Sequence, residues 1–215
     1  TLAALKNTLV LAVSSSLIAT IIGTVAAVGI FKLKNRAARS AIMTVTNIPM
    51  MNPDIVTGIS MMLLFVFVCV RLAGAASLSF ATVLIAHITF NLPYVILSVM
   101  PKLRQMDKHL TEAALDLGCR PSQVFSRVIL PLSGPGILSG LTMVFVPAVS
   151  TFYISQKLGS TGTTLIGDVI ESQFKTAYNP NLGAAMSLVL MILIFICVAI
   201  MNRFGEGDGE EVIKV

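Results

Sequence analysis

The chain has 215 residues, of which 55% are hydrophobic and only 12% are charged, and its mean hydropathy is +0.89. A soluble domain carries roughly 25% charged residues, so this composition excludes an ordinary soluble fold and favours an integral membrane protein. The net charge of +5 does not predict a nucleic-acid partner, because the basic residues gather in the loops beside apolar segments, where they set membrane topology.

Five apolar segments are long enough to cross a bilayer as helices, which takes about 20 residues each. In chain order they cover residues 8–31, 41–70, 80–100, 133–154 and 182–202. None of them alternates as a barrel strand does, so the sequence predicts an all-α, polytopic transmembrane helical bundle. The chain begins at Thr1 without an intact signal peptide, and we expect a sixth, N-terminal span to precede it.

The lysines and arginines divide unequally between the two sides of the predicted bundle. Four lie on one side (Lys6, Arg71, Lys157 and Lys175), and eleven lie on the other (Lys32, Lys34, Arg36, Arg39, Lys102, Arg104, Lys108, Arg120, Arg127, Arg203 and Lys214). The richer side faces the cytoplasm. This places the loop 102–132 inside the cell and the segment 155–180 outside. The acidic, glycine-rich tail 205–215 follows the membrane domain 1–204 and is predicted to be disordered.

The first two spans carry features that simple membrane anchors do not need. Ala19, Gly23 and Ala27 recur every four residues, which predicts a stripe on which another helix packs closely; chance in an alanine-rich segment is the alternative. Asp54 is the carboxylate inside a hydrophobic span, and ionisable groups there line a substrate path by default. The alternative is that Asp54 stabilises the first turn of a helix that restarts after Pro53.

Prolines inside three of the predicted spans remove backbone hydrogen bonds and tend to break or kink a helix. They are Pro53, Pro93 and Pro147. Broken helices at membrane depth are tolerated where they line a cavity or are buried in protein. Their presence in three different spans therefore favours a transport pathway over a set of anchors.

The cytoplasmic loop 102–132 predicts two short helices. Asp107 can cap a helix over 108–117, and Gly118 can end it in the left-handed conformation. Apolar and small residues fall on one face of this helix, namely Leu110, Ala113, Ala114 and Leu117. Pro121 suits the first turn of the second helix, whose apolar face carries Val124, Phe125 and Val128. These faces meet either a partner protein or the chain's own spans.

The outer segment 155–180 carries Asp168 and Glu171, which are three residues apart and would share one face of a helix. They could attract a cationic substrate, or they could form an ordinary solvated acidic face. Tyr153, next to Phe152, could add a cation–π contact or serve as an interfacial aromatic residue.

The sequence contains no motif for ATP binding or metal binding. There is no GxxxxGK[ST] sequence, so the chain cannot cradle ATP itself, and we expect ATP and magnesium to bind a partner subunit. His87, His109 and the three cysteines have no metal-ligand spacing, so we expect no metal and no cofactor in this chain. His87 is expected to be a hydrogen-bonded packing residue. The chain is therefore not expected to be an enzyme.

The loop contains a pattern of fixed spacing. Three residues separate Glu112-Ala113-Ala114 from Gly118. Nine further residues separate Gly118 from Val128, which is followed after one residue by Leu130 and Pro131. This resembles the EAA signature of membrane permeases of bacterial ATP-binding-cassette importers, of the type I class. Val128 stands where the family usually has Ile, and Arg120 where a capping Ser is common. The resemblance implies that the first helix is a coupling helix, which sits in a groove of a cytoplasmic ATPase dimer.

The resemblance covers nearly the whole chain and is strongest to spermidine/putrescine permeases. The runs that carry it are "MMNPDIVTGIS", "LIAHITFNLPYVILSVMPKLRQMD" and "GTTLIGDVIESQF". It implies a second permease subunit, an extracytoplasmic solute-binding protein, a small-molecule substrate and contact with membrane lipid. Alternatives are an importer of another substrate (an inorganic anion, iron or an amino acid), a secondary transporter or channel, and a membrane assembly protein without a pathway.

Overall fold

The structure is a computed structural model that describes residues 2–51, 54–73, 79–151, 153–159 and 164–211; of these, the side chains of 54, 72, 73, 108, 153 and 204–211 lie outside the description. All regular elements in the described part are helices: α1 (Leu2–Lys32), α2 (Arg36–Met51), α3 (Asp54–Ala73), α4 (Phe80–Gln105), α5 (Lys108–Asp116), α6 (Pro121–Val124), η1 (Phe125–Ile129, a π-helix), α7 (Leu130–Leu132), α8 (Gly134–Ser150), α9 (Tyr153–Leu158), α10 (Ile166–Lys175) and α11 (Pro180–Glu211). This confirms the all-α prediction.

Three described helices are long and apolar enough to cross a membrane alone: α1, α4 and the Pro180–Arg203 part of α11. Two bent pairs also pass if each counts as one span, which brings the number to five. In one pair α2 and α3 meet at 107°, and in the other the segment Pro121–Leu132 meets α8 at 67°. These five candidates overlap the five spans predicted from hydropathy, two of them as bent pairs.

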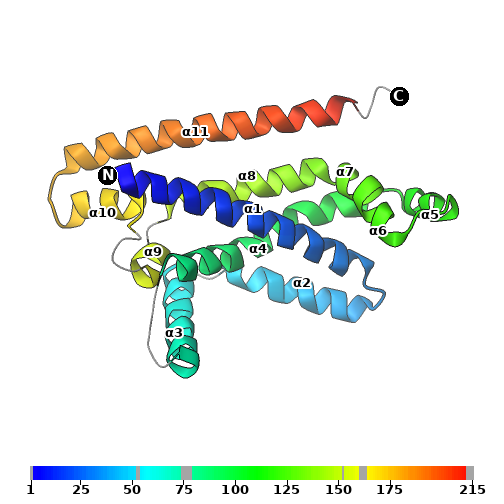
Figure 1. The fold of residues 1–215 in the computed structure, drawn as a ribbon, viewed down its shortest axis with the longest axis horizontal. Helices are drawn as coiled ribbons and strands as arrows, with labels where there is room; N and C mark the ends of the chain where they lie inside the picture. Colours follow the sequence, from blue (N-terminus) through cyan, green and yellow to red (C-terminus); the bar gives the residue numbers. More distant parts are fainter. Residues whose placement is uncertain (1, 52–53, 74–78, 152, 160–163, 212–215) are drawn as a thin grey trace.

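Helices α1, α4 and α8 form the centre of the bundle, with α11 alongside α8 and α2 beside α4 (Figure 1). The predicted stripe on α1 is buried, and it packs against α4. A Cβ atom on Gly23 would lie only 2.7 Å from Val95 Cγ1. Glycine at this position therefore lets the two backbones approach closely, as the spacing predicted.

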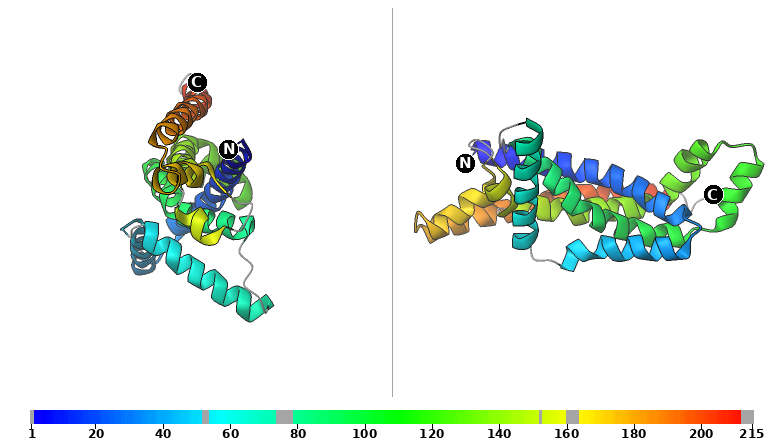
Figure 2. Two further views of the ribbon diagram at one scale, coloured as in Figure 1. Left: turned by 90° about the vertical axis from the view of Figure 1, so that its left-hand side faces the viewer. Right: turned by 90° about the horizontal axis from the view of Figure 1, so that it is seen from below.

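Helix α3 departs from the bundle, as both views in Figure 2 show. It packs mainly on the short helix α9. Most of the large apolar side chains of α2, α3 and α11 are exposed in the isolated chain, among them Val45, Phe67 and Phe195. In a bilayer such surfaces contact lipid tails or another subunit.

Helices α4 and α8 run through Pro93 and Pro147, so neither proline ends its helix, and a kink at either residue stays a prediction. Each proline removes one backbone hydrogen bond, while the bonds before and after it still hold the helix. Pro53 lies outside the described residues. Helix α11 continues to Glu211, and the disorder that we expect for the tail 205–215 stays a prediction. No proline follows Pro180 to stop that helix.

Candidate functional site

Helices α5, α6, η1 and α7 lie together at one end of the bundle, opposite α10 (Figure 1). Helix α5 begins where the sequence predicts. The Asp107 side chain accepts a hydrogen bond from the His109 backbone N–H, with 3.0 Å between Oδ1 and N. This bond satisfies one of the free donors at the helix N-terminus.

Gly118 ends α5 in the left-handed conformation, with φ of +83°. Its N–H donates to the Leu115 carbonyl at 2.9 Å, and the Cys119 N–H donates to the Ala114 carbonyl at 3.1 Å. These two bonds are the Schellman arrangement, which turns the chain sharply and satisfies the last carbonyls of the helix. A Cβ at Gly118 would meet nothing within 4 Å, so the backbone angle alone demands glycine.

The predicted apolar face of α5 is divided between the chain's own core and open surface. Ala114 is 9% exposed and belongs to the core, whereas Leu110 is 45% exposed and Leu117 is 85% exposed. Glu112 is also exposed, with its Oε2 atom 3.4 Å from His109 Nδ1. Packing on the chain's own helices therefore accounts for Ala114 but leaves two leucines uncovered.

The second helix of the loop is anchored in the core. Val124 and Ile129 are 2% and 4% exposed, and they belong to one apolar cluster with residues of α1, α4 and α8. Val128 is half-buried against the same cluster. Gln123, which the sequence did not single out, caps this helix, because its Oε1 atom accepts from the Arg120 backbone N–H at 2.8 Å. This bond satisfies the backbone donor of Arg120 at the start of the helix.

The chain passes from this second helix into α8 through a π-helical turn. The Leu130 N–H donates to the Phe125 carbonyl, one residue further back than in an α-helix. The ring of Pro131 would clash with the Arg127 carbonyl in an ordinary helix, and the wider turn is a common response to such strain. The segment that joins α5 to α8 is itself packed against α1 and α4.

At the other end of the bundle, Asp168 joins α9 to α10. The Ser155 hydroxyl donates to Asp168 Oδ1 at 2.7 Å, and the Leu165 backbone N–H donates to Oδ2 at 2.9 Å. Burial raises the pKa of Asp168, and the negative charge of Glu171 raises it further, while the Leu165 and Ser155 hydrogen bonds lower it. Asp168 of α10 therefore links its own helix to α9 through the hydrogen bond from Ser155.

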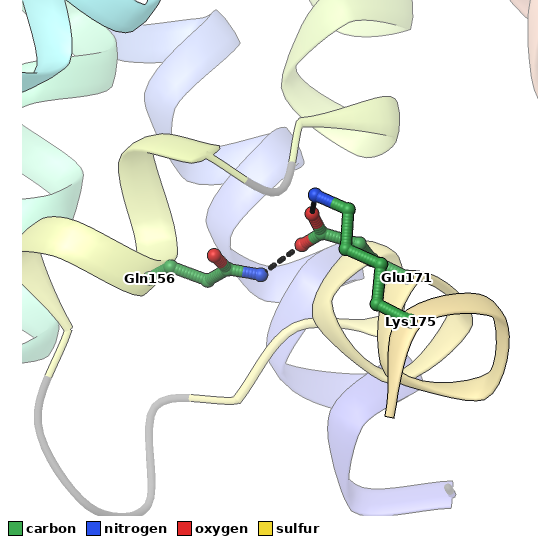
Figure 3. A network of polar contacts seen from close by, with 3 residues as sticks. All are labelled: Gln156, Glu171 and Lys175. Carbon is green, nitrogen blue, oxygen red and sulfur yellow. Dashed lines mark hydrogen bonds and ion pairs between the residues drawn. The ribbon is translucent and has the colours of Figure 1, made fainter. Parts of the chain in front are cut away.

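Glu171 is engaged as well, since it contacts Gln156 of α9 and Lys175 of α10 (Figure 3). Its side chain is only 13% exposed. Two further hydrogen bonds at this end of the bundle were not predicted from the sequence. The Ile166 N–H donates to Thr8 Oγ1 at 2.8 Å, and the Thr82 hydroxyl donates to the Leu158 carbonyl at 2.9 Å. The acidic pair is thus part of a network that ties α9 and α10 to α1 and α4.

Asp54 and Tyr153 begin α3 and α9, which pack against each other; their side chains lie outside the description. A small cavity lies next to both helix starts. It is lined by Thr57, Gly58 and Met61 of α3, Ala86 and Phe90 of α4, and Ile154 of α9. The fold therefore brings these two substrate-path candidates, which are far apart in sequence, to neighbouring elements.

The remaining polar candidates have structural contacts. His87 is 3% exposed, and its Nδ1 atom lies 2.8 Å from the Val83 carbonyl, as expected for a packing histidine. Among the described residues there is no group of three His, Cys, Asp or Glu side chains that could hold a metal ion.

Comparison with known proteins agrees with this architecture. Residues 19–206 match the family described as binding-protein-dependent transport system inner membrane component. The putrescine transport system permease protein PotI of Escherichia coli (strain K12) is 30% identical over 189 residues, which cover 88% of this chain and 67% of that protein. The spermidine/putrescine transport system permease protein PotC of Shigella flexneri is 29% identical over 214 residues, covering 98% and 78%.

Two solved structures have the same fold. A chain of a bacterial ABC transporter involved in the import of the acidic polysaccharide alginate superposes with a TM-score of 0.80 and 17% identity, over 95% of this chain and 78% of that chain. A chain of the MetNI methionine ABC transporter superposes with a TM-score of 0.74 and 18% identity, over 94% and 93%. At these identities the likeness establishes the fold and not the substrate.

Proposed function

Since this chain belongs to the family of inner-membrane components of binding-protein-dependent transport systems, we propose that it forms part of the path through which an ATP-driven importer moves polyamines into the cell. The chain is a permease subunit of an ABC importer and lies in the inner membrane. It is not itself an enzyme. The finer assignments concern the coupling surface, the substrate and the partners.

The proposed coupling surface is the segment with the EAA pattern, and one observation carries it. Leu110 and Leu117 stay exposed on α5, while the second helix is buried in the cluster shared with α1, α4 and α8. An apolar surface of this kind on a well-anchored helix suits the groove of a cytoplasmic ATPase. Glu112, Ala113, Ala114 and Gly118 shape the projecting helix, and Val128, Leu130 and Pro131 join it to α8.

The proposed substrate class is a polyamine such as putrescine or spermidine. The support is the identity of about 30% with permeases named for these substrates, over most of this chain. Asp54 adds a physical argument, because a carboxylate within an apolar span stabilises a passing ammonium group. Tyr153 could offer its ring to the same cation.

Asp168 and Glu171 contribute negative charge at the outer end of the proposed path. Their present hydrogen bonds to Ser155 and Gln156 mean that direct contact with substrate would require the α9–α10 network to open. A role in steering cations by charge requires no such opening.

The proposed partners are an ATPase dimer that binds ATP and magnesium, a second permease subunit, and a solute-binding protein on the outer face. Permease subunits of this class need no cofactor of their own. A solved structure of the same fold, at 17% identity, is that of a bacterial alginate ABC transporter in complex with a periplasmic protein, which supports the last of these partners. No nucleic-acid partner is proposed.

Transport by the purified, assembled complex tests the proposal. Proteoliposomes that contain the complex, loaded with ATP on the cytoplasmic side, should accumulate labelled spermidine or putrescine. Unlabelled polyamine should compete, whereas methionine, iron and inorganic anions should not. Uptake that is blocked by one of these other solutes would reassign the substrate within the class. Uptake without any ATPase subunit would instead indicate a secondary transporter or channel.

A further inference from the structure

A groove opens between α2 and α4 near the end of the bundle that carries α5–α7. It has a volume of about 350 Å³ and is lined by Met43 of α2 and by Leu97, Met100, Pro101, Arg104 and Gln105 of α4. Its inner part is apolar, since Met100 is buried and Met43 packs against the main apolar cluster. Arg104 and Gln105 are exposed and make its mouth polar.

A second arginine lies on α2 at the helical level that corresponds to Arg104 on α4. Arg39 lies one helical turn before Met43 on α2, and Arg104 lies one turn after Met100 on α4. The start of α2 and the end of α4 are at the same end of the bundle (Figure 1). The Cζ atom of Arg39 lies 5.5 Å from the centre of the Phe31 ring, a contact that orients its guanidinium group. Among the described residues, neither arginine takes part in an ion pair.

We propose that this groove binds an anionic phospholipid from the cytoplasmic leaflet, with an acyl chain against Met43 and Leu97 and the phosphate between Arg39 and Arg104. Guanidinium groups bind phosphate through paired hydrogen bonds. Basic pockets between membrane helices on the cytoplasmic side suit such headgroups, and the leaflet supplies the complementary charge. The apolar floor and basic mouth match the two parts of one lipid molecule.

A second copy of this chain fits the groove less well. A symmetric partner seated on this groove would bring its own Arg39 and Arg104 to the same mouth. Like charges brought together there would repel each other. Helix α2 has no fully buried residue in the isolated chain, so its surface is available to a lipid.

Lipid retention by the assembled transporter tests the proposal. The complex is equilibrated with vesicles of phosphatidylcholine, or of phosphatidylcholine mixed equally with phosphatidylglycerol, and the lipids that remain bound are counted by native mass spectrometry. Phosphatidylglycerol should be retained in preference. R39Q and R104Q should each weaken its retention about fivefold, the effect of removing one basic residue near the surface. Since Arg104 is exposed, R104Q alone tests the site without disturbing the core.

Arg71 provides a matched control. Its Cζ atom also lies 5.5 Å from an aromatic ring, that of Phe67, but it is at the far end of α3. R71Q should leave phosphatidylglycerol retention unchanged. Equal retention of both lipids, full retention by R104Q, or an equal loss with R71Q would overturn the proposal. A disulfide between two copies carrying M43C in native membranes would show that a second permease occupies the groove instead.

Discussion

At the scale of single residues, Asp54 is the position where charge and helix capping can be separated. We expect Asp54→Asn to lower the uptake of labelled spermidine by about tenfold, the effect of roughly 1.4 kcal/mol, at an unchanged level of protein in the membrane. Asparagine still caps a helix but lacks the charge that stabilises an ammonium group. Asp54→Leu, which removes both properties, should reduce uptake at least as far.

If the expectation fails, the two variants distinguish the charge of Asp54 from its capping role. Uptake at the wild-type rate by Asp54→Asn, together with a damaged Asp54→Leu, would leave only the capping role. It would also remove the main physical support for a cationic substrate. Equal membrane levels, measured by blotting, are needed for either comparison.

Asp168 predicts a stability effect that depends on pH. Ser155→Ala removes the hydroxyl that donates to Oδ1, which should cost about 1 kcal/mol of unfolding free energy while Asp168 is ionised. The pKa of Asp168 is already raised in the folded state, so the free energy of unfolding decreases as the pH rises through this pKa and Asp168 ionises. Loss of the Ser155 donor makes this decrease larger. The difference between variant and wild type should therefore shrink as the pH falls through the pKa of Asp168.

Thermal unfolding in detergent between about pH 4 and pH 7 measures this difference. Ser172→Ala is a suitable control, because the Ser172 hydroxyl donates to the Val169 carbonyl within α10 and not to a carboxylate. Its effect on stability should not vary with pH. A Ser155→Ala defect that is constant over the range would mean that the hydroxyl does not act through the Asp168 charge.

At the scale of elements, the turn after α5 should control how the coupling helix is presented. Gly118→Val places a branched side chain at φ of +83°, where residues other than glycine are strained by roughly 1–2 kcal/mol. We expect the complex to insert and assemble but to lose transport and stimulated ATP hydrolysis. Gly118→Asn should keep part of both activities, because asparagine tolerates this conformation.

The control for this turn is Gly29→Val, since a Cβ at Gly29 also meets nothing within 4 Å and the residue lies in an ordinary helix. That variant should transport normally. Normal uptake by Gly118→Val would exclude the turn as a determinant of coupling.

The contact between α1 and α4 should be sensitive to a single methyl group. In Gly23→Ala the new Cβ would lie 2.7 Å from Val95 Cγ1 and 2.8 Å from Val95 Cβ, so the helices must separate. We expect a loss of about 1–3 kcal/mol in stability, measured by thermal unfolding. Adding Val95→Ala should recover part of it, whereas Gly29→Ala should have little effect. Equal effects of Gly23→Ala and Gly29→Ala would contradict close packing.

At the scale of the whole molecule, the basic asymmetry predicts which end faces the cytoplasm. The native cysteines Cys69, Cys119 and Cys197 would first be replaced by alanine. In intact cells an impermeant maleimide should then label a cysteine at exposed Thr176 but not one at exposed Ser122 until the membrane is opened. The reverse pattern would invert the topology and move α5–α7 to the outside.

Much of the architecture can be predicted from local sequence. The five spans follow from runs of apolar residues, because the hydrocarbon core admits little else. Gly118 and Asp107 could be assigned to the two ends of α5 because capping depends on backbone groups a few residues away. The EAA pattern identified the family for the same reason, since its spacing lies within one continuous segment.

Only the tertiary structure decided which polar and apolar groups find partners. Asp168 meets Ser155 and Thr8 meets Ile166 because the fold brings α9, α10 and α1 together, and no local pattern encodes such distances. The same holds for α5, where Ala114 is buried while Leu117 on the predicted face is open. Pro93 and Pro147 lie within continuous helices, which the sequence pattern alone did not determine. Local sequence therefore determined the elements and their ends, and packing between distant segments determined their contacts.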